Sequence, residues 1–163
     1  MKLSNILEGV NGKLVKGNTD IEIKLMTIDS RKAGEGILFI AMVGMTTDGH
    51  KFIPSAYEKG CRAVITEHSV ENLPEDITVY QVEDARDALD VMAANFYKNP
   101  GRELNMIGVT GTNGKTSTTY FIESVLNHIK HKTAVIGTVE IRIGGKKREI
   151  DFATSTTPDT IEL

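Results

Sequence analysis

The sequence has no tryptophan, few aromatic residues and a single cysteine. Cys61 therefore has no internal disulfide partner, and no cysteines and histidines have the spacing of a metal site. No stretch approaches the roughly 18 apolar residues of a membrane-spanning helix, and the N-terminus lacks a secretory apolar region. These absences exclude a disulfide scaffold and predict a reduced, cytoplasmic protein with no membrane partner.

An excess of charge of one sign is also missing. The chain carries 19 basic and 22 acidic side chains, a formal net charge of -3. No global field therefore favours nucleic acid, and any anionic ligand must be bound locally. The composition, 40% hydrophobic and 25% charged, is typical of an ordinary soluble α/β protein.

Short apolar runs alternate with helical patterns along the chain, which predicts an α/β fold with a largely parallel or mixed sheet. The sequence Asn99-Pro100-Gly101 predicts a domain boundary at about residue 101, because proline stops a helix. The expected domains are residues 1–101 and 102–163. In the first domain we expect strands at 26–29, 37–41, 63–66 and 78–82, and helices at about 52–59, stopped by Gly60, and from a cap at Asp84 to near 99.

After the boundary the pattern restarts. It predicts a strand at 105–110, a glycine loop, a helix from about 116 to 130, a strand at 133–136 and a hairpin turning at Gly144-Gly145. Only about 60 residues follow the boundary, whereas a nucleotide-binding domain usually has roughly 100 to 200. We therefore expect an incomplete second domain and a chain that is the front part of a longer protein.

The most informative segment runs from Gly108 to Ser117 and reads Gly-Val-Thr-Gly-Thr-Asn-Gly-Lys-Thr-Ser. In such a loop, glycines let backbone N–H groups converge on phosphate oxygens, and the following helix adds its positive dipole end. Lys115 would neutralise the outer phosphates, and the Thr116 hydroxyl would be a ligand of Mg²⁺. Val109 stands where the common phosphate-loop pattern has glycine. The alternative is a turn that serves only close packing, but the expected flanking strand and helix favour a nucleotide site.

Three motifs in order along the chain resemble the Mur ligase family. Residues 110–116 look like the ATP loop of that family, whose members use this variant of the phosphate loop. Asp29-Ser30-Arg31, followed by residues 36–41 and 44–53, resembles the N-terminal domain of the family. Ser155-Thr156-Thr157-Pro158-Asp159 is similar to a segment that follows the loop in the tripeptide-forming members.

The resemblance implies an ATP- and Mg²⁺-dependent amide ligase of peptidoglycan synthesis. Such an enzyme adds meso-diaminopimelate or L-lysine as the third amino acid to UDP-N-acetylmuramoyl-L-alanyl-D-glutamate through an acyl phosphate. The implied fold is a small N-terminal α/β domain that binds the UDP substrate, followed by the start of a phosphate-loop-type ATP-binding α/β domain. The amino-acid-binding domain, the modified lysine and a further magnesium carboxylate would lie beyond Leu163. The 163 residues alone would then be inactive and able to self-associate, whereas the full-length enzyme would be a monomer.

The resemblance also implies the site residues. Lys115 would be the catalytic residue, and Thr116 would hold the metal. The residues implied for ATP are Gly111, Thr112, Asn113, Gly114, Lys115, Thr116 and Ser117. Those implied for the UDP portion are Ile28, Ser30, Met45, Thr46 and Thr47, and those for the muramoyl peptide are Ser155, Thr156 and Thr157.

Several residues have alternative interpretations. Asp29-Ser30 can equally be a turn whose side chains bond nearby backbone, and Thr156-Thr157-Pro158 can be an extended connector. His50 is expected beside a helix start, Cys61 in the core, and Lys146-Lys147-Arg148 on a solvated hairpin face. None of these last residues receives a catalytic role.

Alternatives also stay open for the function. One is another ligase of the same family, which would add D-alanyl-D-alanine or D-glutamate. Folylpolyglutamate and cyanophycin synthetases also belong to this superfamily. Residues 1–100 resemble a UDP-binding domain, which folylpolyglutamate synthetases lack. A different class is a non-catalytic phosphate-loop module, which has no reason to recognise uridine.

Overall fold

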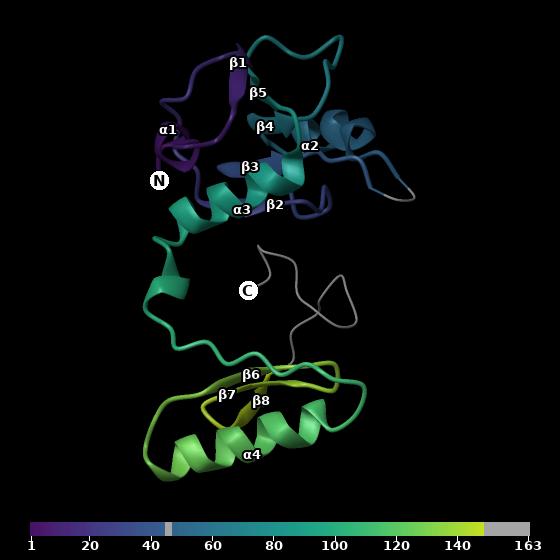
Figure 1. Ribbon diagram of the computed structural model, residues 1–163. Helices are drawn as coiled ribbons and strands as arrows, with labels where there is room; N and C mark the ends of the chain where they lie inside the picture. Colours follow the sequence, from purple (N-terminus) through teal and green to yellow (C-terminus); the bar gives the residue numbers. More distant parts are fainter. Residues whose placement is uncertain (45–46, 149–163) are drawn as a thin grey trace. The chain divides into compact units, whose positions relative to one another are not determined.

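The computed structural model describes residues 1–44 and 47–148. The chain forms two compact units, Met1–Glu103 and Leu104–Leu163, each built on a sheet of its own (Figure 1). Helices and strands alternate along the chain, so the expected α/β class is confirmed. Within the described ranges, no helix combines the length and the apolar character needed to cross a membrane.

The first unit contains a five-stranded mixed sheet, which includes the four strands that the sequence predicts and one edge strand that it does not. The strand order is β1-β5-β4-β3-β2, in which β2 to β5 run parallel and β1 pairs antiparallel with β5. The carboxyl ends of the four parallel strands therefore meet at one edge, where ligands of open α/β sheets usually bind. The strands are β1 (Gly12–Lys16), β2 (Leu25–Thr27), β3 (Ile37–Ile40), β4 (Ala63–Thr66) and β5 (Thr78–Val82).

Helices cover both faces of this sheet, and Figure 1 shows α2 and α3 on opposite sides of β3 and β4. The short helix α1 packs against α3. Gly60, with a φ of 98°, follows the end of α2 and is the predicted stop. The helical elements are α1 (Leu3–Ile6), the 3-10 helix η1 (Gly49–Phe52), α2 (Ile53–Glu58), α3 (Ala85–Phe96) and the 3-10 helix η2 (Pro100–Arg102).

The core follows from the alternation of side chains along the strands. Phe39, Val64 and Val79 pack with Ile53 and Ala56 of α2 in one buried cluster. The intervening strand residues point to the opposite face, and the fully buried side chains there include Leu38, Ile40, Ile65, Leu89 and Met92. Both faces are apolar, so the central strands are continuous hydrophobic runs in the sequence.

Cys61 belongs to the cluster beneath α2 and is fully buried. Its Sγ lies 3.2 Å from the carbonyl oxygens of Ile37 and Ala63. Burial raises the pKa of the thiol, which disfavours the nucleophilic thiolate. The interpretation of Cys61 as a packing residue is confirmed.

Asp84 caps α3 as predicted. Its Oδ1 accepts hydrogen bonds from the backbone N–H groups of Arg86 at 2.8 Å and Asp87 at 3.0 Å. We expect Asp84→Ala to lower the free energy of unfolding by about 1 kcal/mol, the typical value of such a cap, as measured by urea denaturation. The matched control is Glu83→Ala, which removes a neighbouring exposed acid. Equal unfolding curves for the two variants would contradict the capping role.

The second unit is described by one helix and one antiparallel sheet of order β6-β7-β8. Arg142 of β7 joins the sheet to the helix, because its Nε donates to Glu123 Oε2 at 2.9 Å. The hairpin turns at Gly144-Gly145 as expected, and Lys146-Lys147-Arg148 is exposed as expected. The elements are α4 (Lys115–His128), β6 (Ala134–Ile136), β7 (Ile141–Ile143) and β8 (Lys146–Arg148).

The strand predicted at 105–110 is wrong, because these residues have no regular secondary structure. A strand is held by hydrogen bonds to a neighbouring strand. Among the described residues of the second unit, the sheet contains only β6, β7 and β8, and none of them pairs with this segment. Met106 and Ile107 are consequently 79% and 57% exposed, although their composition is that of a buried strand.

Candidate functional site

The glycine loop of the second unit leads directly into α4, whose first residue is Lys115. Gly111 and Gly114 have φ angles of 145° and 79°, which residues with a side chain rarely adopt. No steric contact requires glycine at Gly114, since an added Cβ would meet nothing within 4 Å. The glycine is therefore required by the backbone conformation of the loop.

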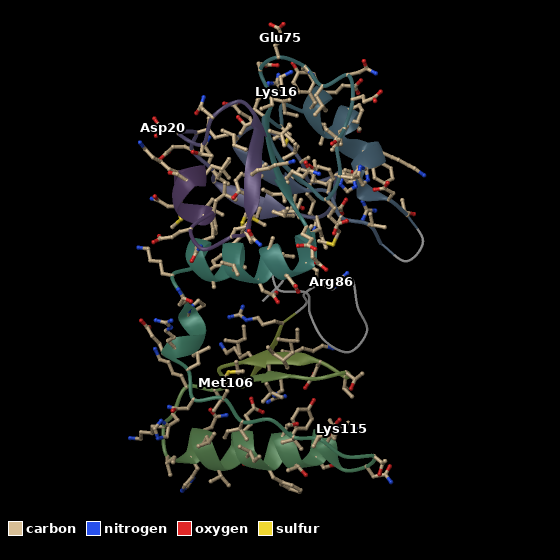
Figure 2. The ribbon with its side chains drawn as sticks, turned by 45° about the horizontal axis from the view of Figure 1, so that its top comes forward. Lys16, Asp20, Glu75, Arg86, Met106 and Lys115 are labelled. Carbon is tan, nitrogen blue, oxygen red and sulfur yellow. The ribbon has the colours of Figure 1, made fainter. Side chains whose placement is uncertain are left out.

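Lys115 folds back over this loop (Figure 2). Its Nζ donates to the carbonyl oxygen of Gly111 at 2.6 Å and to that of Thr112 at 3.5 Å. The side chain is exposed, so the ammonium group remains accessible to a ligand. An exposed cation is thus already placed against the loop that the sequence assigns to phosphate.

The N-terminus of α4 has the properties of an anion site. No side chain caps the helix, and its first turn contains no acidic residue. The first N–H groups of a helix lack partners inside it, and the helix dipole places positive charge there. Thr116 and Ser117 are exposed in the same turn, so their hydroxyl groups can reach a bound phosphate or its metal ion.

In the first unit, Ile28 and Ser30 directly follow β2. The Asp29 carboxylate accepts from the Arg31 backbone N–H at 2.9 Å and from the Arg31 guanidinium, whose hydrogen bonds lower the pKa of Asp29. Asp29 therefore forms a turn in which its side chain bonds nearby backbone, as the alternative interpretation of Asp29-Ser30 predicts. Ser30 is different, because only its backbone carbonyl, and not its hydroxyl, is hydrogen-bonded within residues 1–44 and 47–148.

After β3, the described residues 43–44 and 47–48 pair with each other, and we call this segment the 43–48 hairpin. Val43 and Asp48 pair antiparallel at its base, and the Gly44 N–H donates to the Thr47 carbonyl at 3.0 Å. Thr47 is exposed, while Met45 and Thr46 lie outside the described residues. Because β2 and β3 are parallel neighbours, Ile28, Ser30 and the hairpin lie beyond the same edge of the sheet. Ser155, Thr156 and Thr157 also lie outside the described residues.

Asp48, His50 and His68 offer ligand atoms within 4.8 Å of one another, as a metal site would. However, both ring nitrogens of His50 are engaged. Its Nε2 accepts from the Glu67 N–H at 2.9 Å, so Nδ1 carries the proton and donates to Asp48 Oδ1 at 2.6 Å. No lone pair of the buried ring remains for a cation, and we assign no metal to this group.

His50 lies in η1, just before the start of α2, as the sequence predicts. Its contacts with Asp48, Glu67 and His68 hold it there. The ring is stacked on His68, with ring centroids 3.8 Å apart. A hydrogen bond from the His50 backbone N–H lowers the pKa of Asp48 to about 2, so this carboxylate is ionised at neutral pH. The group is a structural support for the base of the 43–48 hairpin.

Two supporting residues gave no signal in the sequence. Lys59 Nζ donates to the Ser30 carbonyl at 2.9 Å and fixes the turn after β2. Glu67 accepts hydrogen bonds from Val43 and Ala85. Both act on partners far away along the chain, which no local pattern indicates.

Two family models match most of the chain. "Mur ligase family, catalytic domain" matches residues 22–97, and "Mur ligase middle domain" matches residues 109–163. UDP-N-acetylmuramoyl-L-alanyl-D-glutamate--2,6-diaminopimelate ligase 1 of Clostridium acetobutylicum is 44% identical over 163 residues. The ligase of Clostridium tetani with the same name, without the final number, is 41% identical over 165 residues. Each alignment covers 100% of this chain and 33% of the relative, so the chain spans about one third of the curated relatives it matches.

Solved structures also match. One is the UDP-N-acetylmuramoylalanyl-D-glutamyl-2,6-diaminopimelate--D-alanyl-D-alanyl ligase of Acinetobacter baumannii, with a TM-score of 0.63 and 29% identity. A crystal structure of MurF from Acinetobacter baumannii has a TM-score of 0.64 and 29% identity. Both matches cover 78% of this chain and 28% of the solved chain.

Proposed function

Because this chain belongs to the Mur ligase family, we propose that it is the part of an amide ligase that binds the UDP-linked substrate and ATP. The proposed reaction adds meso-2,6-diaminopimelate to UDP-N-acetylmuramoyl-L-alanyl-D-glutamate in peptidoglycan synthesis. We place it in the cytoplasm, where ATP is available. The observation that carries the proposal is the exposed loop at the start of α4, with Lys115 folded over it.

ATP is proposed to bind along this loop. The backbone N–H groups from Gly111 to Ser117 would surround its phosphates, and the Lys115 ammonium would leave the loop carbonyls for the outer phosphate oxygens. The Thr116 hydroxyl suits Mg²⁺, which prefers hard oxygen ligands together with phosphate oxygens and water. When bound, the ion would neutralise charge on the phosphates. Thr116 would hold it from the helix side.

The chemistry explains why an amide ligase needs such a loop. A carboxylate is a poor electrophile, so ATP would first phosphorylate the side-chain carboxylate of D-glutamate. The amine of the incoming diamino acid would then attack the acyl carbon, and phosphate would leave with the carboxylate oxygen. Lys115 would stabilise the charge that develops on the transferring phosphoryl group, and a positioned cation does this most effectively where water is excluded.

The first unit is proposed to bind the uridine end of the substrate. Ile28 and Ser30 lie after β2, Thr47 lies in the 43–48 hairpin after β3, and Met45 and Thr46 precede Thr47 in the sequence and are proposed for the same site. The free hydroxyl of Ser30 supports this role, because it can donate a hydrogen bond to the ligand. Ser155, Thr156 and Thr157 are proposed to contact the muramoyl peptide.

Sequence identity favours diaminopimelate over the other candidate additions. The relatives at 44% and 41% identity are named as 2,6-diaminopimelate ligases, whereas the D-alanyl-D-alanyl ligase among the matched structures is 29% identical. A non-catalytic nucleotide module is the remaining alternative. It would bind ATP through the same loop but would not discriminate between UDP and other nucleotides at the first unit.

We expect Ser30→Ala to weaken UDP binding by the chain about tenfold, the effect of losing about 1.4 kcal/mol from one hydrogen bond. Affinity for ATP should stay the same, because its site lies in the other unit. Isothermal titration calorimetry with UDP and with ATP measures both. Ser55→Ala, at an exposed position of α2, is the matched control. Absence of UDP binding by the unaltered chain would favour the non-catalytic module.

A further inference from the structure

Both legs of the 43–48 hairpin are tied to one residue, Glu67, which directly follows β4. The Val43 N–H on the first leg donates to Glu67 Oε2 at 2.7 Å. The second leg is reached through a relay: the Glu67 N–H donates to His50 Nε2 at 2.9 Å, and His50 Nδ1 donates to Asp48 Oδ1 at 2.6 Å. The carboxylate and the amide of Glu67 therefore hold the two legs separately.

Glu67 also connects the hairpin with α3. Its second carboxylate oxygen, Oε1, accepts from the Ala85 N–H at 3.0 Å, at the first residue of the helix. The next residue, Arg86, which is labelled in Figure 2, extends its Nη2 to 4.0 Å from the Sδ of Met42, just before the hairpin. The hairpin base, the end of β4 and the start of α3 thus form one hydrogen-bonded group.

The chemistry of the group selects a carboxylate at position 67. An ionised carboxylate has two acceptor oxygens and no proton to donate, so it satisfies both N–H groups at once. A glutamine side chain of the same shape would turn its NH₂ group toward one of those two donors. One hydrogen bond would be lost, and the glutamine NH₂ would face the backbone N–H of Val43 or Ala85. Two donors in contact destabilise the fold by more than the loss of the hydrogen bond alone.

His50 is selected in a similar way. Its ring is 4% exposed, and it must accept on Nε2 while donating from Nδ1. This tautomer is fixed by the Glu67 N–H on one side and by the ionised Asp48 on the other. The His50 ring thus accepts from the Glu67 N–H and donates to Asp48. Through these two hydrogen bonds, Glu67 holds the second leg of the hairpin.

We propose that Glu67 is a positioning residue of the uridine site, and that it acts through Val43 on one leg and His50 on the other. It does not touch the nucleotide. It keeps the described base of the hairpin, Val43, Gly44, Thr47 and Asp48, in the conformation in which the exposed Thr47 faces the UDP portion, and this role rests on the proposed function for the identity of the ligand. A hairpin that populates other conformations binds more weakly in proportion to the competent fraction.

The test is Glu67→Gln in the 163-residue chain, with Glu71→Gln at an exposed position of the β4–β5 connection as the matched control. We expect UDP affinity to fall about tenfold, equivalent to about 1.4 kcal/mol, with ATP affinity unchanged. Hydrogen exchange should accelerate at the amide that loses its acceptor, Val43 or Ala85, and stay slow in β3 and β4. A merely structural role would instead raise exchange across the whole sheet.

A second pair of variants keeps the test decisive if Glu67→Gln unfolds the unit. His50→Gln places an amide oxygen where Nε2 accepts, whereas His50→Leu offers no acceptor to the Glu67 N–H. We expect the glutamine variant to retain most of the UDP affinity and the leucine variant to lose it. Equal affinities in the two variants would overturn the relay.

The outcomes separate this role from the uridine site itself. If Glu67→Gln binds UDP as tightly as the unaltered chain while Ser30→Ala binds it weakly, the positioning role is wrong and the uridine site stands. If the unaltered chain does not bind UDP, the uridine site is wrong and the positioning role falls with it. Slow exchange at both the Val43 and the Ala85 amides in Glu67→Gln would also overturn the role, whatever the affinity.

Discussion

Replacing Lys115 with alanine in the full-length protein is expected to lower the rate of amide formation sharply while binding of the UDP-linked substrate stays largely intact. The Nζ of Lys115 is the cation folded over the Gly111–Gly114 loop, and no backbone group can supply its charge. Removal of one preorganised electrostatic group typically costs about 3–4 kcal/mol of transition-state stabilisation, or roughly a hundred- to a thousandfold in rate. Phosphate release and mass spectrometry of the product measure the loss.

Two further variants make this result specific. Lys132→Ala removes an exposed lysine from the same unit and should leave turnover unchanged. Lys115→Arg keeps the charge but presents a planar, bulkier group, so we expect an intermediate rate. Near-normal turnover of Lys115→Ala would contradict the assignment of the loop to ATP. A loss of UDP-substrate affinity as large as the loss of rate would instead indicate a folding defect.

The central strands could be predicted because their burial on both faces appears in the sequence as continuous apolar runs. β3 and β4 occupy 37–40 and 63–66, and the expected ranges were 37–41 and 63–66. A parallel strand covered on both faces is a short, continuous apolar run, and glycine or polar residues mark its ends. The cap at Asp84 and the stop at Gly60 were equally local, since each acts on residues next to it in the chain.

The edge of the sheet could not be predicted in this way. β1 (Gly12–Lys16) carries lysine on both sides of Leu14 and Val15, which are 44% and 52% exposed, so no buried run indicates a strand. It forms because β5 offers its free edge, and that partner comes much later in the chain. The segment 105–110 is the opposite case, with the composition of a strand and no partner among the described strands. Strand formation depends on the neighbour as much as on the residues themselves.

The same distinction applies to the candidate site. The phosphate loop is contiguous, so its glycines, Lys115 and Thr116 could be recognised together from spacing alone. The supports of the uridine site are not contiguous, since Glu67 joins Val43, His50 and Ala85 from three different segments. A glutamate after an apolar strand is ordinarily a solvated residue, and only the tertiary structure shows its two occupied oxygens.

Gly17→Ala is expected to be the most destabilising of the variants considered for the first unit. Gly17 directly follows β1 and lies against Thr78 of β5, where only glycine fits. Gly17 has a φ of 78°, and an added Cβ would lie 2.7 Å from the Cα of Thr78 and would also overlap Thr78 Oγ1. The backbone conformation costs about 1–2 kcal/mol for a residue with a side chain, and the overlap costs about 1–3 kcal/mol more.

Thr78 has little freedom to relieve this overlap. It is 4% exposed at the start of β5, and its Oγ1 donates to the Asn18 carbonyl at 3.2 Å, so a shift would break the contact between β5 and the segment that follows β1. Against a typical stability of about 5–15 kcal/mol, we expect a clearly lower urea midpoint, followed by circular dichroism. Gly101→Ala is the matched control, because a Cβ there meets nothing within 4 Å and the φ is not positive. If both variants unfold at the same urea concentration, Gly17 does not lie against Thr78 as described.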